Sequence, residues 1–333
     1  MKNIEVIDFK VNSRISVAPM MDWTTRDYRY LARLLNPHVV LYSEMVTTGA
    51  ILHGDQARHL DFDAKELPLV LQLGGSDPQQ LAECSRIGEQ WGYSAINLNV
   101  GCPSDRVQHN KIGACLMAEP DLVAECITAM QNAVKIPVTI KHRIGIDHLD
   151  SYEQMLQFVD TVAVTGCQHF IVHARIALLN GLSPKENREI PPLRYDDVYR
   201  LKQERPHLTI EINGGIKTVA EVEQHLQHVD GVMIGREAYH HPYLLAELAQ
   251  HFDGIALPNR IEIMQQMLDY MAQRVASGVP LSVMTRHILG LFQHLPNARK
   301  WRQALSGGNA KTLADVERAV QMMQQAFSSI ENP

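Results

Sequence analysis

Eight short apolar runs recur between about residues 15 and 250, and longer amphipathic stretches separate them. Each run holds four or five residues, mostly β-branched residues or leucine, which suits strands buried on both faces of a parallel sheet. The runs cover residues 15–19, 39–43, 69–73, 95–99, 138–142, 169–173, 209–213 and 231–234. Two of the helical stretches between them begin at Asp77-Pro78 and Glu119-Pro120, with proline where its missing N–H is not needed. Because this alternation is close to the roughly 250 residues typical of the fold, we expect a (β/α)8 TIM barrel, with a doubly wound open sheet as the alternative.

The strand pattern stops beyond Pro258. Apolar residues at helical spacing then indicate helices over residues 261–276, 281–295, 299–305 and 313–330. We therefore expect a barrel domain over residues 1–255 and a small C-terminal helical domain over residues 256–333.

The composition indicates a globular protein of a reducing compartment. With 45% hydrophobic residues and no long apolar run, the sequence predicts no membrane span. The first residues lack the apolar segment of a signal peptide, and the five cysteines form no C-x-x-C pair, which argues against disulfides or a metal site and for the cytoplasm. The formal net charge of −6 gives no general attraction to nucleic acid, so an RNA partner would need a local basic face. Nothing indicates an obligate protein partner.

Polar residues and glycines end most of the predicted strands, on the side where barrel enzymes build their active sites. They are Ala18-Pro19-Met20, Gln72, Asn97, Asn99, Lys141, Arg143, His173, Asn213-Gly214-Gly215 and Gly235-Arg236. One such residue alone could be a satisfied buried polar group, but the whole set is hard to explain as packing. Two long irregular loops, residues 100–117 and 174–192, follow the fourth and sixth predicted strands and should contribute to the same face.

Glycines follow the seventh and eighth predicted strands, and Arg236 stands beside the second group. In this fold, the loops after these two strands form the usual phosphate site, because backbone N–H groups can approach an anion closely there. Gly214-Gly215 could instead form only a tight turn. The pattern favours a phosphate monoester, while the lack of a G-x-G-x-x-G after the first strand does not indicate a Rossmann-type dinucleotide site.

Gln72 and Lys141 suggest the remainder of that ligand. An amide can hydrogen-bond the edge of a heteroaromatic ring in both directions, and a cation beside N1–C2=O stabilises a reduced flavin. Lys141 could alternatively form a Schiff base or pair with a carboxylate. Cys102, in a Gly-Cys-Pro loop, is the candidate general acid, because Pro103 favours extended geometry and the thiol is protonated at neutral pH. Cys115 in the same loop is its rival, although Leu116-Met117 beside it suggest burial.

Several motifs in order resemble the tRNA-dihydrouridine synthases. They are residues 16–24 (SVAPMMDWT), 71–75 (LQLGG), 97–104 (NLNVGCPS), 138–141 (VTIK) and 212–216 (INGGI). Residues 181–192 (GLSPKENREIPP) are similar to the A subfamily. The resemblance runs from about Arg14 to Tyr243 and continues more weakly around residues 286–302, with His142 as a departure where a small residue is expected.

This resemblance implies bound FMN, NADPH as its reductant, and tRNA reduced at uridines 20 and 20a of the D-loop. It implies that hydride passes from the flavin N5 to uracil C6 while Cys102 protonates C5, on a uridine flipped out of the RNA. The implied FMN-binding residues are Ala18, Pro19, Met20, Gln72, Lys141, His173, Asn213, Gly214, Gly215, Gly235 and Arg236. The implied tRNA-binding residues are Asn99, Lys185, Arg188, Arg299 and Arg302.

Two other functions remain open at this point. An FMN-dependent barrel oxidoreductase of a small pyrimidine or a related molecule would share the flavin residues but would not need the basic helical domain. A tRNA-binding chaperone on a degenerate barrel would not need the complete set of Gln72, Lys141 and Cys102.

Overall fold

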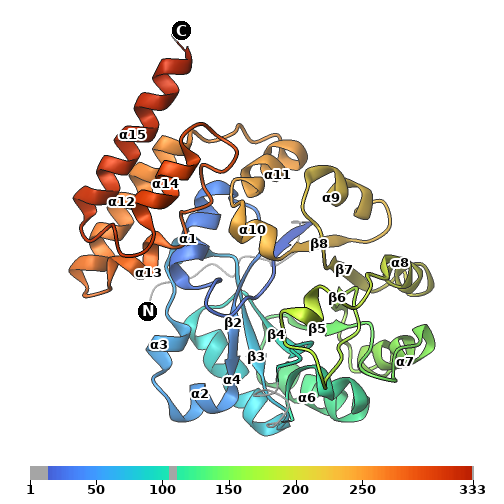
Figure 1. The fold of residues 1–333 in the computed structure, drawn as a ribbon. Helices are drawn as coiled ribbons and strands as arrows, with labels where there is room; N and C mark the ends of the chain where they lie inside the picture. The colour runs from blue at the N-terminus through green and yellow to red at the C-terminus, as the bar shows by residue number, and fades with distance from the viewer. Residues whose placement is uncertain (1–13, 105–110, 332–333) are drawn as a thin grey trace. The chain divides into compact units, whose positions relative to one another are not determined.

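The computed structural model describes residues 14–104 and 111–331, and its centre is a single sheet of eight parallel strands (Figure 1). The strands follow the order β1-β8-β7-β6-β5-β4-β3-β2. They are β1 (Ile15–Val17), β2 (Leu41–Thr47), β3 (Leu69–Gly74), β4 (Ala95–Val100), β5 (Val138–Arg143), β6 (His169–His173), β7 (Thr209–Asn213) and β8 (Gly231–Ile234). Each overlaps the apolar run that predicted it.

Two backbone hydrogen bonds join β1 to the residue that precedes β2. The Val17 N–H donates to the Val40 carbonyl at 2.9 Å, and the Val40 N–H donates to the Ile15 carbonyl at 3.0 Å. Since β1 also pairs with β8, the sheet closes on itself. The predicted (β/α)8 barrel is therefore confirmed, and the open sheet is excluded.

Local signals in the sequence begin and end the helices between the strands. Asp77 accepts a hydrogen bond from the Gln80 N–H at 2.8 Å before α4 (Pro78–Trp91), which ends at the left-handed Gly92, φ 94°. Capping boxes begin α7 (Tyr152–Ala163) and α9 (Val219–His225). The other helices of this part are α2 (Thr48–His53), α3 (Gln56–Leu60), η1 (Ala64–Glu66), η2 (Gly113–Ala118), α6 (Pro120–Ala133), η3 (Glu186–Arg188) and α8 (Tyr195–Glu204).

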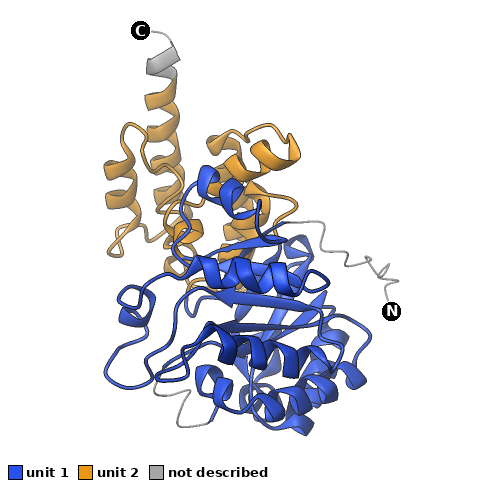
Figure 2. Cartoon of the chain, turned by 90° about the vertical axis from the view of Figure 1, so that its right-hand side faces the viewer, with its two compact units in different colours: residues 1–22, 40–235 blue, residues 23–39, 236–333 orange. Residues whose placement is uncertain are grey.

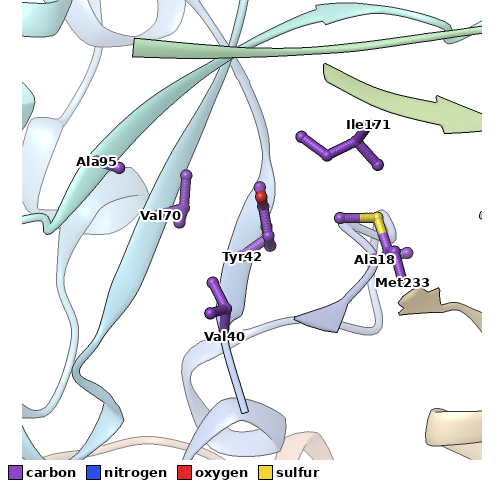
Figure 3. Packing of buried hydrophobic residues seen from close by; sticks show 7 residues of the cluster. All are labelled: Ala18, Val40, Tyr42, Val70, Ala95, Ile171 and Met233. Atoms are coloured by element: carbon purple, nitrogen blue, oxygen red, sulfur yellow. The ribbon is translucent and has the colours of Figure 1, made fainter. Parts of the chain in front are cut away.

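Apolar side chains from six strands and the segments at their ends meet inside the barrel (Figure 3). The cluster consists of Ala18, Val40, Tyr42, Val70, Ala95, Ile171 and Met233. Neighbouring inward positions are polar, and among them Ser16 and Glu211 are 2% and 4% exposed. The interior is therefore a packed core with a few buried polar groups, on which the strand ends are supported.

The chain divides into two compact units (Figure 2). The barrel unit comprises residues 1–22 and 40–235, and the second unit comprises residues 23–39 and 236–333. Residues 23–39 and 236–255, which the sequence analysis assigned to the barrel domain, thus group with the C-terminal helices. The helices of the second unit are α1 (Arg26–Leu35), α10 (Arg236–His240), α11 (Leu244–Asp253), α12 (Arg260–Ala276), α13 (Leu281–Thr285), α14 (Ala298–Leu305) and α15 (Leu313–Glu331). None of the described helices could cross a membrane.

The second unit has its own buried contacts. Asp27 of α1 accepts hydrogen bonds from the Tyr270 hydroxyl at 2.7 Å and from Arg274 Nε at 3.1 Å, both of α12. The predicted helix over residues 281–295 is wrong beyond Thr285, where turns replace it. Gly290 packs so closely on the His240 carbonyl that a Cβ would lie 2.1 Å from its oxygen, and His294 has a φ of 65°.

Candidate active site at the C-terminal end of the barrel

Parallel pairing brings the polar strand ends together at one end of the barrel. Gln72 is in register with Asn97, Asn99 with Lys141, and His173 with both Arg143 and Asn213. The predicted polar ring is thus assembled from consecutive strands.

Three amides and a hydroxyl form one chain of hydrogen bonds across β3, β4 and β5. Asn99 Nδ2 donates to Gln72 Oε1 at 2.8 Å, Gln72 Nε2 donates to Asn97 Oδ1 at 2.8 Å, and Asn97 Nδ2 donates to Thr139 Oγ1 at 2.9 Å. All four side chains are buried. Because every amide has a fixed partner, the orientation of Gln72 is determined before any ligand binds.

Asn99 also holds the loop that carries Cys102. Its Oδ1 accepts hydrogen bonds from the Gly101 N–H at 3.0 Å and the Cys102 N–H at 2.9 Å. The Cys102 thiol is half-buried and lies 3.7 Å from Ser104 Oγ. Sequence reasoning gave Asn99 only a role toward the substrate, because a loop hydrogen bond of this kind has no sequence signal. Residues 105–110 of the same loop lie outside the described residues.

The rival thiol, Cys115, is held differently. It contacts the Ile112 carbonyl at 3.3 Å, and burial raises its pKa. The other three cysteines are buried, and burial raises the pKa of each to about 12: Cys84, Cys126 and Cys167. Cys102 is therefore the thiol of this loop that lies next to the amide chain, through the hydrogen bond from its N–H to Asn99.

Lys141 places an ammonium group at the same end. The pKa of Lys141 is lowered to about 7, mainly by burial and also by the charge of Arg143, while the charges of Glu211 and Cys102 act in the opposite direction. An anionic partner beside Lys141 would raise its pKa and favour the charged ammonium form.

His173 is a neutral imidazole with an unfilled hydrogen-bonding position. Burial holds the pKa of His173 well below its usual range, and the charge of Arg143 adds to the effect. Its Nδ1 is buried without a hydrogen-bond partner among the described residues. Such an atom is costly unless a ligand satisfies it.

Arg143 joins two loops around this site. Its Nε donates to the Gly101 carbonyl at 2.9 Å, and its Nη1 donates to the carbonyls of Ile176 at 2.9 Å and Asn187 at 3.0 Å. The sequence placed Arg143 at a strand end but could not reveal this role. It fixes the loop of Cys102 to the loop of residues 174–192.

Leu193 packs closely on the glycines after β7, where a larger side chain would not fit. Gly214 and Gly215 have φ values of 123° and 77°, and a Cβ on Gly215 would lie 2.6 Å from Leu193 Cδ1. Asn213 donates to the Met233 carbonyl at 2.8 Å. Gly235 follows the last residue of β8, and Arg236 is the first residue of α10.

The basic residues predicted to meet RNA are exposed. Lys185 and Arg188 lie on the loop after β6, which is organised by the buried Asn187 through hydrogen bonds to the Leu178 N–H at 2.8 Å and carbonyl at 2.9 Å. Arg299 and Arg302 lie on α14 of the second unit. Among the described residues, no group of three metal-ligating side chains could hold a metal ion.

A closed barrel with amides, cations and a thiol at the C-terminal ends of its strands belongs to the class of barrel enzymes. A sequence profile described as "Dihydrouridine synthase (Dus)" matches residues 16–330. The chain belongs to this family.

Curated relatives agree with the profile. The chain is 59% identical over 321 residues to a "tRNA-dihydrouridine(20/20a) synthase" of Synechocystis sp., covering 96% of this chain and 95% of the relative. It is 54% identical over 320 residues to a protein of the same name from Vibrio cholerae, covering 95% and 96%. A solved 2-naphthoyl-CoA reductase complex has a similar fold, with a TM-score of 0.55 and 12% sequence identity. The match covers 73% of this chain and 50% of the reductase chain.

Proposed function

We propose that this enzyme reduces uridine to 5,6-dihydrouridine at positions 20 and 20a of the tRNA D-loop, with FMN as its flavin and NADPH as reductant. The observation that carries the proposal is the family match over nearly the whole described chain, together with relatives named for this reaction. The site supports it, because Cys102, Gln72 and Lys141 lie in one hydrogen-bonded and electrostatic arrangement.

The residues at the barrel end fit FMN. His173 offers a buried Nδ1 that lacks a partner among the described residues, and Lys141 offers a half-buried amino group. Gly214 and Gly215 adopt positive φ values where a Cβ would meet Leu193, a backbone conformation suited to glycine. Ala18, Pro19 and Met20 would lie against the ring, Gln72 would bind its edge, Lys141 would face N1–C2=O and His173 would lie beside the ring. Asn213, Gly214, Gly215, Gly235 and Arg236 would hold the phosphate. When bound and reduced by NADPH, FMN supplies the hydride for uracil C6.

The chain's own residues complete the reduction. As C6 gains the hydride, C5 takes the proton of the Cys102 thiol, so the 5,6 double bond becomes a single bond. The thiolate that remains interacts with Lys141 and Arg143, since the charge of Cys102 raises the pKa of both. Asn99 and Arg143 act as positioning residues, because they hold the backbone on either side of the thiol.

A uridine inside folded RNA can reach this site only when it is flipped out of its stack. Lys185 and Arg188, with Arg299 and Arg302, would bind the phosphates around it, and Asn99 keeps one amide hydrogen for the uracil. All five cysteines are free, which fits an enzyme of the cytoplasm.

The test is reconstitution with tRNA that lacks dihydrouridine. The purified protein should show a flavin absorption spectrum, oxidise NADPH when tRNA is present, and produce dihydrouridine that nucleoside mass spectrometry maps to positions 20 and 20a. Turnover of free uracil or uridine with no product in tRNA would instead identify a small-pyrimidine oxidoreductase. Binding of tRNA without flavin or turnover would identify a chaperone.

A further inference from the structure

A buried carboxylate lies inside the barrel, below the site and outside the roles assigned so far. Glu211 of β7 is 4% exposed, and both of its oxygens are bound. Oε1 accepts a hydrogen bond from the Ser16 hydroxyl of β1, and Oε2 lies 3.1 Å from His169 Nε2 of β6. Its neighbours otherwise include the apolar cluster around Tyr42 and Ile171.

Strand register brings Glu211 to the level of Lys141. Lys141 pairs with Ile171, and Ile171 pairs with Glu211, so the three inward positions follow one another across β5, β6 and β7. Ile171, which is paired with both residues, belongs to the apolar interior (Figure 3). Charges separated by apolar side chains interact more strongly than charges separated by water.

We propose that Glu211 is the counter-charge that favours the protonated form of Lys141 near neutral pH, held in place by Ser16 and His169, and that it thereby sets the pH range over which the barrel binds flavin. Glu211 is a positioning residue, since it acts on the cofactor through Lys141. The effect on flavin binding rests on the proposed FMN site, whereas the effect of Glu211 on the protonation of Lys141 does not.

The other groups around Lys141 do not supply this charge. Arg143 on the same strand and His173 on β6 add positive charge or none, and Cys102 is negative only after it gives up its proton. His142, on the opposite face of β5, is neutral because burial lowers its pKa to about 4. Glu211 is therefore the carboxyl group among the described residues whose charge raises the pKa of Lys141.

The size of the effect follows from the distance between strands. The backbones of two strands separated by one other strand lie roughly 10 Å apart. At an effective dielectric constant of about 20, a charge at that distance shifts a protonation equilibrium roughly tenfold. Glu211→Gln keeps the shape of the side chain but removes its charge and replaces one accepting oxygen with an amide group that donates. It should lower the pH at which Lys141 loses its proton by about one unit.

The decisive measurement needs no flavin. Lys141 in the full-length protein freed of flavin is labelled with an amine-reactive reagent from pH 5 to 9, and the extent of labelling is read by peptide mass spectrometry. Half-maximal reactivity should occur about one pH unit lower in Glu211→Gln than in the parent protein. The control Ser16→Ala keeps the carboxylate and should differ from the parent by much less. A Glu211→Gln profile equal to that of the parent would overturn the proposal.

Flavin binding gives the second readout and separates the two halves. If FMN binds as proposed, its affinity for Glu211→Gln should be several-fold weaker than for the parent at pH 7.5 and the same at pH 5.5, where Lys141 is protonated in both. In a Lys141→Met background, Glu211→Gln should have no effect at either pH. An equal loss of affinity at both pH values would mean that Glu211 acts only on the fold. A shifted labelling profile without FMN binding would contradict the flavin assignment and leave the charge pair standing.

Discussion

Asn99 accepts a hydrogen bond from the backbone N–H of Cys102 at 2.9 Å, and the same side chain donates to Gln72 at 2.8 Å. One buried amide thus connects the expected proton donor with the residue expected to bind the flavin edge. The position of the thiol relative to the flavin site is therefore set by the strands and not by the loop alone.

Cys102→Ala should slow dihydrouridine formation by about 10²–10⁴-fold, because a positioned general acid contributes on this order. FMN content and NADPH oxidation by the bound flavin should stay close to those of the parent, since the thiol holds neither. Single-turnover assays with tRNA and mass spectrometry of the product measure the effect.

Cys115→Ala is the matched control for this loss. Cys115 lies in the same loop region but contacts the Ile112 carbonyl, so its removal should leave turnover within about a few-fold of the parent. If Cys115→Ala abolished turnover and Cys102→Ala did not, the proton donor would be misassigned.

Much of the fold could be read from the sequence, because each strand is a short apolar run buried on both faces. All eight runs became strands, and Asp77-Pro78 and Glu119-Pro120 began helices as expected. The helix predicted over residues 281–295 ended early, because its apolar spacing says nothing of the close approach of Gly290 to the His240 carbonyl.

The candidate site was predictable in its residue types but not in its connections. Strand ends carry recognisable polar residues, so Gln72, Lys141 and His173 could be selected. The hydrogen bonds of Arg143 to carbonyls 33 to 44 positions away depend on how the loops close. Glu211 was not selected because it lies in mid-strand, where the sequence gives no sign of its partners.

Arg236→Ala should weaken FMN binding about tenfold to a hundredfold, because a charge-assisted hydrogen bond to a phosphate is worth roughly 1.5–3 kcal/mol. The dissociation constant of FMN, measured by fluorescence quenching, tests this expectation. Lys135→Ala is the control, since this exposed lysine precedes β5 and lies at the opposite end of the barrel. An unchanged dissociation constant for Arg236→Ala would remove this arginine from the phosphate site.

His142→Leu should reduce the amount by which the free energy of unfolding falls between neutral and acidic pH. His142 is fully buried against Phe158 and Phe170, and burial lowers its pKa to about 4 from 6.5. Between these pH values the unfolded chain binds more protons than the folded one, so the free energy of unfolding falls as the pH falls. At about 1.4 kcal/mol per pKa unit, this group costs about 2–3 kcal/mol by pH 4.

Urea denaturation at pH 7.5 and pH 4.5 measures this contribution. The loss of unfolding free energy between the two pH values should be smaller in His142→Leu by about 2 kcal/mol. His59 is exposed and provides the control. His59→Leu should lose as much unfolding free energy between the two pH values as the parent protein. Equal losses in His142→Leu and the parent would show that His142 does not resist protonation in the fold.

Because the overall charge is negative, we expect tRNA to bind through a few basic side chains. On the barrel unit, Lys185 and Arg188 are exposed beside Asn187, which is fixed by Arg143. On the second unit, α14 buries Trp301 and Leu305, and the Trp301 indole donates to the Ile288 carbonyl at 3.0 Å. The exposed face of this anchored helix carries Arg299, Lys300 and Arg302.

Replacing Lys185 and Arg188, or Arg299 and Arg302, with alanine should therefore weaken tRNA binding while FMN content and NADPH oxidation by the bound flavin remain unchanged. Each lost phosphate contact should also reduce the slope of log affinity against log salt by about 0.7–0.9. The matched control replaces Lys65 and Lys135, which are exposed where the chain approaches β3 and β5 from the other end of the barrel. This control changes the net charge by the same amount, so a general electrostatic effect would weaken binding equally in all three double variants. Only a larger loss and a flatter salt dependence in the first two would show that these side chains contact the RNA backbone.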